Sequence, residues 1–128
     1  MPRPSPVTDA IRELVEKDVH HLWSLNELQS AVRVRVPTAN FSTVLRAMGT
    51  LERVGVVQRV DLGDGKSHYE SRRSHHEHVV CESCGRVEEI DGCLASGATR
   101  KAETKTGFKV TDHRLVISGL CPDCLAPA

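Results

Sequence analysis

The sequence predicts an α+β protein of two small domains, and three observations lead to this expectation. Apolar residues recur at helical spacing in three segments before residue 54. An alternating apolar pattern around a Gly-Asp-Gly turn follows, which indicates a β-hairpin. Two Cys-x-x-Cys pairs stand only after residue 80, which indicates a separate half held by a metal. Three short helices followed by a hairpin are typical of a winged helix, a helix-turn-helix with a β-hairpin wing.

The composition limits the size of any core. The chain has 128 residues, of which 39% are apolar and only 3% aromatic. This is a thin supply for two cores, and small domains with thin cores usually need disulfides or metals. Lys and Arg together number 17, as do Asp and Glu, so the formal net charge is zero. Any contact with nucleic acid must therefore come from a local patch.

The first two helical segments carry boundary signals. The first has an apolar stripe that extends from Val7 to Val19. The second begins after Ser24, and Glu27 three residues later completes the signature of a capping box. Pro37 is expected to end this helix.

The third helix should extend from about Thr38 to Arg53. The side chains expected on its buried stripe are those of Val44, Ala47, Met48 and Leu51. The opposite face presents Thr43, Arg46, Thr50 and Arg53. The second helix of a helix-turn-helix enters the major groove of DNA, so these four residues are the candidate DNA contacts. The alternative is a solvated helix face without a partner.

The hairpin and a polar break define the domains. Val56, Val60 and Leu62 alternate before the turn, and the returning strand ends near Glu70. The polar segment 71–74 breaks the pattern. We therefore expect a winged-helix domain at residues 1–70, a hinge at 71–74 and a zinc-stapled α/β domain at 75–128. Its expected elements are strands at His76–Cys81, Arg86–Ile90 and Lys109–Ser118, and a helix with Leu94, Ala98 and Ala102 inward.

Four cysteines form two pairs of identical spacing, Cys81 with Cys84 and Cys121 with Cys124. Each pair presents two thiolates, and a structural Zn²⁺ site requires four such ligands in a tetrahedron. A redox-active Cys-x-x-Cys is the alternative, but a second matching pair and the lack of a βαβ context disfavour it. Cys93 is left over and is expected to be an ordinary small side chain, with a sensing or ligating role as the alternative.

The segment just before the first pair is rich in metal-ligating residues: His75, His76, Glu77 and His78. Side chains alternate along a strand, so His75 and Glu77 face one way while His76 and His78 face the other. Imidazole and carboxylate together suit Fe²⁺, Mn²⁺, Zn²⁺ or Ni²⁺. The possible further ligands are His20, His21, His68, Glu70, Glu88, Glu89, Glu103 and His113. A solvated polar strand is the alternative.

Catalysis is not expected. The sequence contains no His-Glu-x-x-His motif, no nucleophile elbow and no phosphate-binding loop. A small metallohydrolase using the His and Glu cluster is the enzyme alternative. It would need an open coordination position and a general base, which the sequence neither shows nor excludes. The N-terminal segment has no apolar run of signal-peptide length and no membrane-spanning stretch follows, so a cytoplasmic protein without membrane contact is expected.

These motifs together resemble the ferric uptake regulator family of metal-responsive transcription factors. The resemblance covers nearly the whole chain in the expected order. The segment "STVLRAMGTLERVGVV" resembles the recognition helix of the family, "GKSHYE" the exit from its wing, and "HHEHVVCESCG" and "GFKVTDHRLVISGLC" parts of its dimerisation domain. The resemblance implies a cytoplasmic homodimer that binds a palindromic operator in double-stranded DNA and represses metal-homeostasis genes when a divalent metal is bound as corepressor.

The resemblance also implies roles for individual residues. The four paired cysteines would hold the structural Zn²⁺. A regulatory ion, Fe²⁺ first and Zn²⁺, Mn²⁺ or Ni²⁺ as alternatives, would be bound by His21, Glu70, His76, His78 and Glu89. His20 is an alternative to His21. A second metal site would use His75, Glu77 and His113.

Several positions depart from the family pattern. Ser96 stands where members often carry a further ligand of the second site, so this site is expected to be short of one. Leu45 replaces a tyrosine of the recognition helix, and Ser71 stands near a cysteine that zinc sensors commonly carry. Peroxide-sensing, zinc-sensing and nickel-sensing members of the family remain alternatives to the iron-responsive branch. A zinc-stabilised protein-interaction module is the alternative from another class, which the neutral charge and Leu45 favour slightly.

Overall fold

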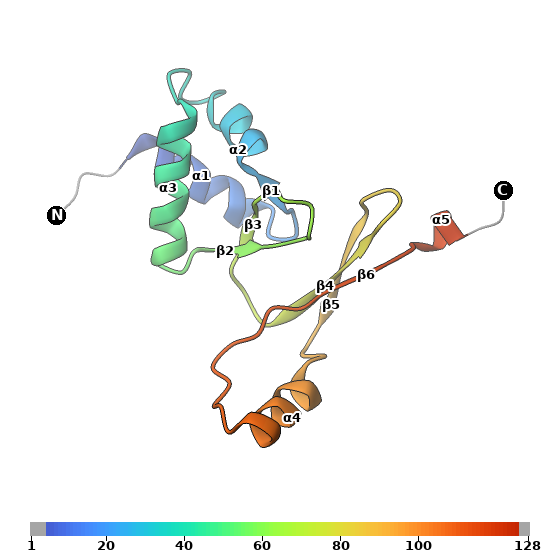
Figure 1. Cartoon of the computed structure of the whole chain (residues 1–128). Coiled ribbons are helices and arrows are strands. Elements are labelled where there is room, and N and C mark those ends of the chain that lie inside the picture. Colours follow the sequence, from blue (N-terminus) through green and yellow to red (C-terminus); the bar gives the residue numbers. More distant parts are fainter. Residues whose placement is uncertain (1–4, 126–128) are drawn as a thin grey trace. The chain divides into compact units, whose positions relative to one another are not determined.

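The computed structural model describes residues 5–125. The chain divides after Arg73 into two compact units, one up to Arg73 and the other from Ser74 onward. Figure 1 shows the helices of the first unit in blue to green and the strands of the second in yellow to red. Within residues 5–125, no helix is long and apolar enough to cross a lipid bilayer.

The first unit combines three helices with a small sheet. Its helices are α1 (Pro6–Lys17), α2 (Leu25–Val32) and α3 (Phe41–Arg53), and its strands are β1 (Trp23–Ser24), β2 (Val57–Val60) and β3 (His68–Ser71). The sheet has the strand order β1-β3-β2, with both pairs antiparallel. The helix-turn-helix with a β-hairpin wing expected from the sequence is confirmed, together with the mixed α+β class of the whole chain.

The helices of this unit enclose one apolar cluster. All four residues predicted on the inner stripe of α3 are buried there. The cluster consists of Val7, Ala10, Ile11, Val15, Leu28, Val32, Ala39, Val44, Ala47, Met48, Leu51, Val57 and Tyr69. Burial of such side chains is the main source of stability in a domain of this size. The wing contributes through Val57 and Tyr69, which ties the hairpin to the helices.

Local capping sets the helix boundaries. The predicted capping box is present, with Ser24 Oγ accepting from the Glu27 amide at 3.1 Å and Glu27 Oε1 accepting from the Ser24 amide at 3.0 Å. Asn40 caps α3 by accepting from the Thr43 amide at 2.9 Å, so this helix begins at Phe41 and not near residue 38. A polar side chain at the N-cap satisfies an amide that has no partner within the helix.

Three other expectations for this unit need correction. Helix α1 ends at Lys17, so Val19 lies outside it. Helix α2 ends at Val32, five residues before Pro37. The segment between them consists of tight turns, in one of which the Val36 amide donates a hydrogen bond to the Val32 carbonyl at 2.8 Å. The sheet contains the additional strand β1, in which Trp23 pairs with Tyr69. A two-residue strand is too short to show alternation in the sequence, and only the partner β3 makes it visible.

The hairpin register also differs in detail. Val57 is buried whereas Val56 is only partly so, while Val60 is buried as predicted and Leu62 lies beyond β2. Strand β3 continues to Ser71, the first residue of the segment predicted as a hinge, and Ser71 pairs with Val57. Gly63 and Gly65 in the turn have φ of 80° and 76°, which glycine adopts without steric cost.

The second unit is a three-stranded sheet with two helices. Its elements are β4 (His76–Cys81), β5 (Val87–Asp91), α4 (Ser96–Thr106), β6 (Val116–Gly119) and α5 (Pro122–Leu125). The central strand β4 pairs with β5 antiparallel and with β6 parallel. The predicted limits of β4 are confirmed, and β5 is shifted by one residue from the prediction.

Two predictions for the second unit are wrong. The strand predicted over Lys109–Ser118 is regular only from Val116 to Gly119, the residues that pair with residues 78–81 of β4. Helix α4 forms, but none of its residues is buried, and Leu94 before it is 52% exposed. Its sequence "SGATRKAETKT" carries alanine as its only apolar residue, so it cannot provide an inward stripe.

Candidate metal centres

The first candidate centre consists of the four paired cysteines. All four sulfur atoms lie within 4.8 Å of one another, those of Cys81, Cys84, Cys121 and Cys124. Cys81 ends β4, Cys84 follows in the turn, and the other pair lies at the start of α5 just after β6. The parallel pairing of Cys81 with Gly119 therefore brings the second pair to the first.

The distances in this centre suit a tetrahedral ion. Cys84 Sγ lies 3.7 Å from Cys121 Sγ. Sulfur atoms bound at about 2.3 Å to one Zn²⁺ are about 3.8 Å apart in a tetrahedron. The amides of Cys84 and Cys121 donate to Cys81 Sγ at 3.5 and 3.4 Å, an arrangement that stabilises a thiolate.

The thiols differ in acidity because of these contacts. The amide of Cys121, followed by that of Cys84, lowers the pKa of Cys81 to about 6. The side chain of Cys121 raises the pKa of Cys124 to about 12. Without a metal, Cys81 is therefore a thiolate at neutral pH while Cys124 keeps its proton. A divalent cation would allow the remaining thiols to ionise, because it offsets the repulsion between neighbouring thiolates.

The second candidate centre lies on one face of β4 and β5. His76 and His78 alternate correctly along β4, and Glu89 pairs directly opposite His78 on β5. The ligand atoms of these three residues lie within 4.8 Å of one another, and both imidazoles are buried. The Nδ1–H of His76 donates to the Ser74 carbonyl at 2.9 Å, which makes Nε2 the unprotonated nitrogen of the neutral imidazole.

The remaining predicted ligands of the regulatory site lie in the first unit. Glu70 on β3 is completely buried, and its Oε1 accepts from Gln58 Nε2 at 2.8 Å. Its Oε2 lies 3.9 Å from Arg73 Nη2. His21 Nε2 contacts Glu27 Oε2 at 2.9 Å, and the His21 ring meets the Trp23 ring edge-on. His21 is therefore already engaged by a carboxylate within its own unit.

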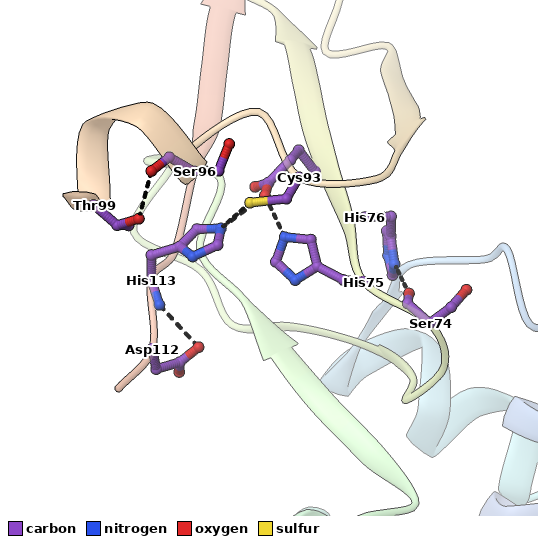
Figure 2. A network of polar contacts seen from close by, with 9 residues as sticks. Ser74, His75, His76, Cys93, Ser96, Thr99, Asp112 and His113 are labelled. Carbon is purple, nitrogen blue, oxygen red and sulfur yellow. Dashed lines mark hydrogen bonds and ion pairs between the residues drawn. The ribbon is translucent and has the colours of Figure 1, made fainter. Parts of the chain in front are cut away.

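The third candidate centre lies on the opposite face of β4. The imidazoles of His75 and His113 both contact Glu77 Oε1, through their Nε2 atoms at 2.5 and 2.8 Å. Burial alone would raise the pKa of Glu77, but the contacts with His113 and His75 outweigh it and lower this pKa. Cys93 Sγ lies 3.8 Å from His113 Nε2 and belongs to the same group. Figure 2 shows His113, Cys93 and His75 side by side, with His76 directed elsewhere.

The two faces of β4 thus carry the two ligand sets that strand alternation separates in the sequence. The residue that sequence reasoning left outside both sets is Cys93. Its spacing to the histidines matches no simple motif, because β4 and β5 separate it from His75 and α4 separates it from His113. Pairing of β5 with the start of β4 was the signal that could have placed it there.

The exposed face of α3 has residues of two kinds. Arg46 and Arg53 are exposed, whereas Thr43 and Thr50 are partly buried. Both threonine hydroxyls are engaged within the helix, since Thr43 Oγ1 donates to Asn40 Oδ1 at 2.9 Å and Thr50 Oγ1 donates to the Arg46 carbonyl at 3.2 Å. Arg53 Nη2 in turn donates to Thr50 Oγ1 at 3.3 Å. Arg46 and Arg53 thus differ from the threonines in being exposed.

Comparison with known proteins agrees with this architecture. The sequence profile of the ferric uptake regulator family matches residues 5–118. The chain is 34% identical over 118 residues to the ferric uptake regulation protein of Bacillus subtilis, a match covering 89% of this chain and 78% of that protein. It is 28% identical over 123 residues to the peroxide-responsive repressor PerR of Staphylococcus aureus, covering 95% and 82% of the two chains.

A solved structure supports the fold over almost the whole length. The ferric uptake regulator from Francisella tularensis with iron superposes with a TM-score of 0.81 at 23% sequence identity. The match covers 97% of this chain and 94% of that one. At this identity the likeness concerns the fold alone.

Proposed function

The chain belongs to the ferric uptake regulator family of metal-responsive transcriptional repressors, and from that premise we propose that a divalent metal ion acts as its corepressor. The observation that carries the proposal is the convergence of His76, His78 and Glu89 on one face of the second unit. Two buried imidazoles and a carboxylate from neighbouring strands form a preorganised half-site for an exchangeable metal. The relatives are named as regulators, and we propose no catalytic activity for this chain.

The first unit supplies the rest of this site in our proposal. Glu70 and His21 belong to the first unit, whereas His76 and His78 belong to the second unit. An ion bound by ligands from both units would fix the angle between them. His21 must then exchange its contact with Glu27 for the metal, and this exchange makes the first unit responsive to the metal. His20 is the alternative ligand in the same segment.

The donor set leaves a short list of metals. Nitrogen and oxygen ligands accept Fe²⁺, Mn²⁺, Ni²⁺ or Zn²⁺, and selection among them depends on geometry and supply. We propose Fe²⁺, because the more similar of the two relatives described above is a ferric uptake regulation protein. The similarity to PerR makes a peroxide-responsive role the second candidate.

The four cysteines have a different role in this proposal. They would hold Zn²⁺ permanently, because four thiolates complete its tetrahedron and leave no open position. Such a site supports folding and does not respond to a change in metal concentration. The chain would thus carry one resident and one exchangeable metal.

We further propose that α3 enters the major groove of double-stranded DNA in the cytoplasm. Arg46 and Arg53 would supply contacts to bases or phosphates, and the wing would flank them. A homodimer presents two such helices related by two-fold symmetry, so the operator should be a palindrome. Metal and operator affinities would be coupled reciprocally, typically by about 1–3 kcal/mol.

The test is a DNA-binding titration of the full chain with a palindromic operator from its own promoter region. We expect tight binding with Fe²⁺ or Mn²⁺ and at least about 10-fold weaker binding after removal of the exchangeable metal. The variant H76A/H78A should lose the metal effect but retain its zinc and its helices. The variant H68A is the matched control, because His68 contacts Asp64 and lies in neither ligand set. Metal-independent binding by the wild type would contradict the corepressor role.

A further inference from the structure

Cys93 has neighbours that give it a chemical role. It lies in the loop between β5 and α4, and its sulfur atom shares a 4.8 Å group with ligand atoms of His75, Glu77 and His113. Figure 2 shows its sulfur atom facing the two imidazoles. Four side chains able to bind a metal therefore meet at one point on the second unit.

The sheet places all four residues there. On one side of β4, His76 pairs with Asp91, and the Gly92 amide donates a hydrogen bond to the His75 carbonyl at 3.2 Å. These contacts bring the loop that contains Cys93 to His75. On the other side, β6 runs parallel to β4 with His78 opposite Val116. Continued beyond the end of this ladder, the same offset would place His113, three residues before Val116, at the level of His75. The contact of His113 Nε2 with Glu77 Oε1 at 2.8 Å agrees with that placement.

The contacts within the group resemble a ligand shell. Glu77 is only 2% exposed, and a buried carboxylate requires compensation. The two imidazoles direct their Nε2 atoms to the same oxygen atom of Glu77. Cys93 Sγ lies 3.8 Å from His113 Nε2, whereas nitrogen and sulfur ligands of one tetrahedral Zn²⁺ are about 3.6 Å apart. Small side-chain movements would open the space for an ion.

We propose that His75, Glu77, Cys93 and His113 form a complete four-ligand metal site in which the Cys93 thiolate replaces the ligand that is missing at Ser96. The thiolate changes the preference of the site. Three nitrogen and oxygen donors alone accept Fe²⁺ and Mn²⁺, whereas a His₂-Glu-Cys set favours thiophilic tetrahedral ions, Zn²⁺ above all. Zn²⁺ would therefore occupy this face of β4 independently of the ion bound by His76 and His78.

Cobalt spectroscopy tests the proposal directly. The full chain, with zinc retained in the four-cysteine site, is titrated with Co²⁺ while its zinc content is measured. A thiolate bound to Co²⁺ produces an intense near-ultraviolet charge-transfer band that nitrogen and oxygen ligands do not produce. We expect this band in the wild type with no loss of zinc. We expect its loss in C93S, with Co²⁺ binding at this site weakened at least about 10-fold.

Two variants serve as controls. S96A should retain the band, because Ser96 supplies no ligand. H76A/H78A should also retain it, because those residues face the other side of β4. A band that persists in C93S, or Co²⁺ binding without a charge-transfer band in the wild type, would overturn the proposal.

Alkylation gives a second measurement that does not depend on cobalt. Zn²⁺ should slow the reaction of iodoacetamide with Cys93 at least about 10-fold, as mapped by mass spectrometry, and H113A should remove this protection. Equal rates with and without Zn²⁺ would contradict the site. None of these readouts involves DNA, so their failure would leave the proposed repressor function standing, and failure of operator binding would not affect them.

Discussion

The two units bury different kinds of side chain. In the first unit a contiguous apolar cluster extends from Val7 to Tyr69 and joins all three helices to the wing. Among the described residues of the second unit, the only buried apolar side chains are those of Cys81 and Ala95, whereas His76, Glu77 and His78 are buried as well. The second unit therefore lacks the usual source of stability and concentrates metal ligands where a core would be. The comparison indicates that hydrophobic burial stabilises the first unit, and in our proposal the metal ions would stabilise the second.

The largest effect is expected on removal of the zinc. Substitution C121S/C124S, or a strong chelator, should abolish the protection of β4, β5 and β6 against amide hydrogen exchange while α1 and α3 keep theirs. Structural zinc sites contribute on the order of 10 kcal/mol to the folding of small domains. S96A is the matched control, because Ser96 is exposed and belongs to none of the three candidate ligand groups. Unchanged protection of β4 without zinc would refute the contrast between the units.

A cavity in the apolar cluster should destabilise the first unit and leave the zinc of the second unit in place. Leu28 is fully buried in the apolar cluster, so Leu28→Ala should destabilise this unit by about 2–5 kcal/mol. Urea unfolding followed by the fluorescence of Trp23 measures the loss. The bound zinc should stay at the wild-type level below the transition. Simultaneous loss of zinc at low urea would show that the two units unfold as one.

The acidity of the thiols predicts how zinc affinity depends on pH. The pKa of Cys81 is lowered to about 6, so this thiol is ionised at pH 7. The pKa of Cys124 is raised to about 12 and that of Cys84 is also raised, so these two thiols hold protons that zinc must displace. Zinc binding near pH 7 should therefore release at least two protons and fewer than four. The affinity should fall at least about 100-fold per pH unit, or about 2.7 kcal/mol.

The direction in which zinc affinity changes with pH, and the increase of its slope at low pH, can both be measured. Zinc is bound by thiolates, so added protons oppose it, and the affinity falls as the pH falls. Below pH 6 Cys81 is protonated as well, and the slope should increase by one proton. Calorimetry in buffers of different ionisation enthalpy counts the released protons. Release of four protons at pH 7 would show that Cys81 is not ionised there.

The smallest effect concerns a cap in the first unit. Ser24→Ala removes the acceptor for the Glu27 amide and should cost about 1 kcal/mol in the urea unfolding of that unit. Ser30→Ala, at an exposed position within the same helix, is the matched control and should be neutral or slightly stabilising. Metal binding by the second unit should be the same in both variants. Equal stability of the two variants would show that the capping box contributes little.

Much of the fold could be predicted because local rules and packing agree. The capping box at Ser24, the inner stripe of α3 and the limits of β4 depend on short patterns, and the structure retains all three. Strand β1 could not be predicted, since two residues contain no period. The course of residues 109–115 could not be predicted either. Apolar and β-branched residues there favour a strand, but the pairing with β4 begins only at Val116.

The residues of the candidate sites likewise fall into those that local sequence patterns predict and those that only strand pairing brings together. Two Cys-x-x-Cys pairs and the alternation of the His and Glu residues along β4 depend only on local geometry. The sequence by itself therefore determined the four cysteines of the candidate centre and the separation of the two faces of β4. Which residues complete each face was decided by the tertiary structure. Glu89 faces His78 through the antiparallel ladder, and His113 and Cys93 reach His75 through strands on either side of β4. Strand pairing joins residues distant in the chain, and no local spacing records it.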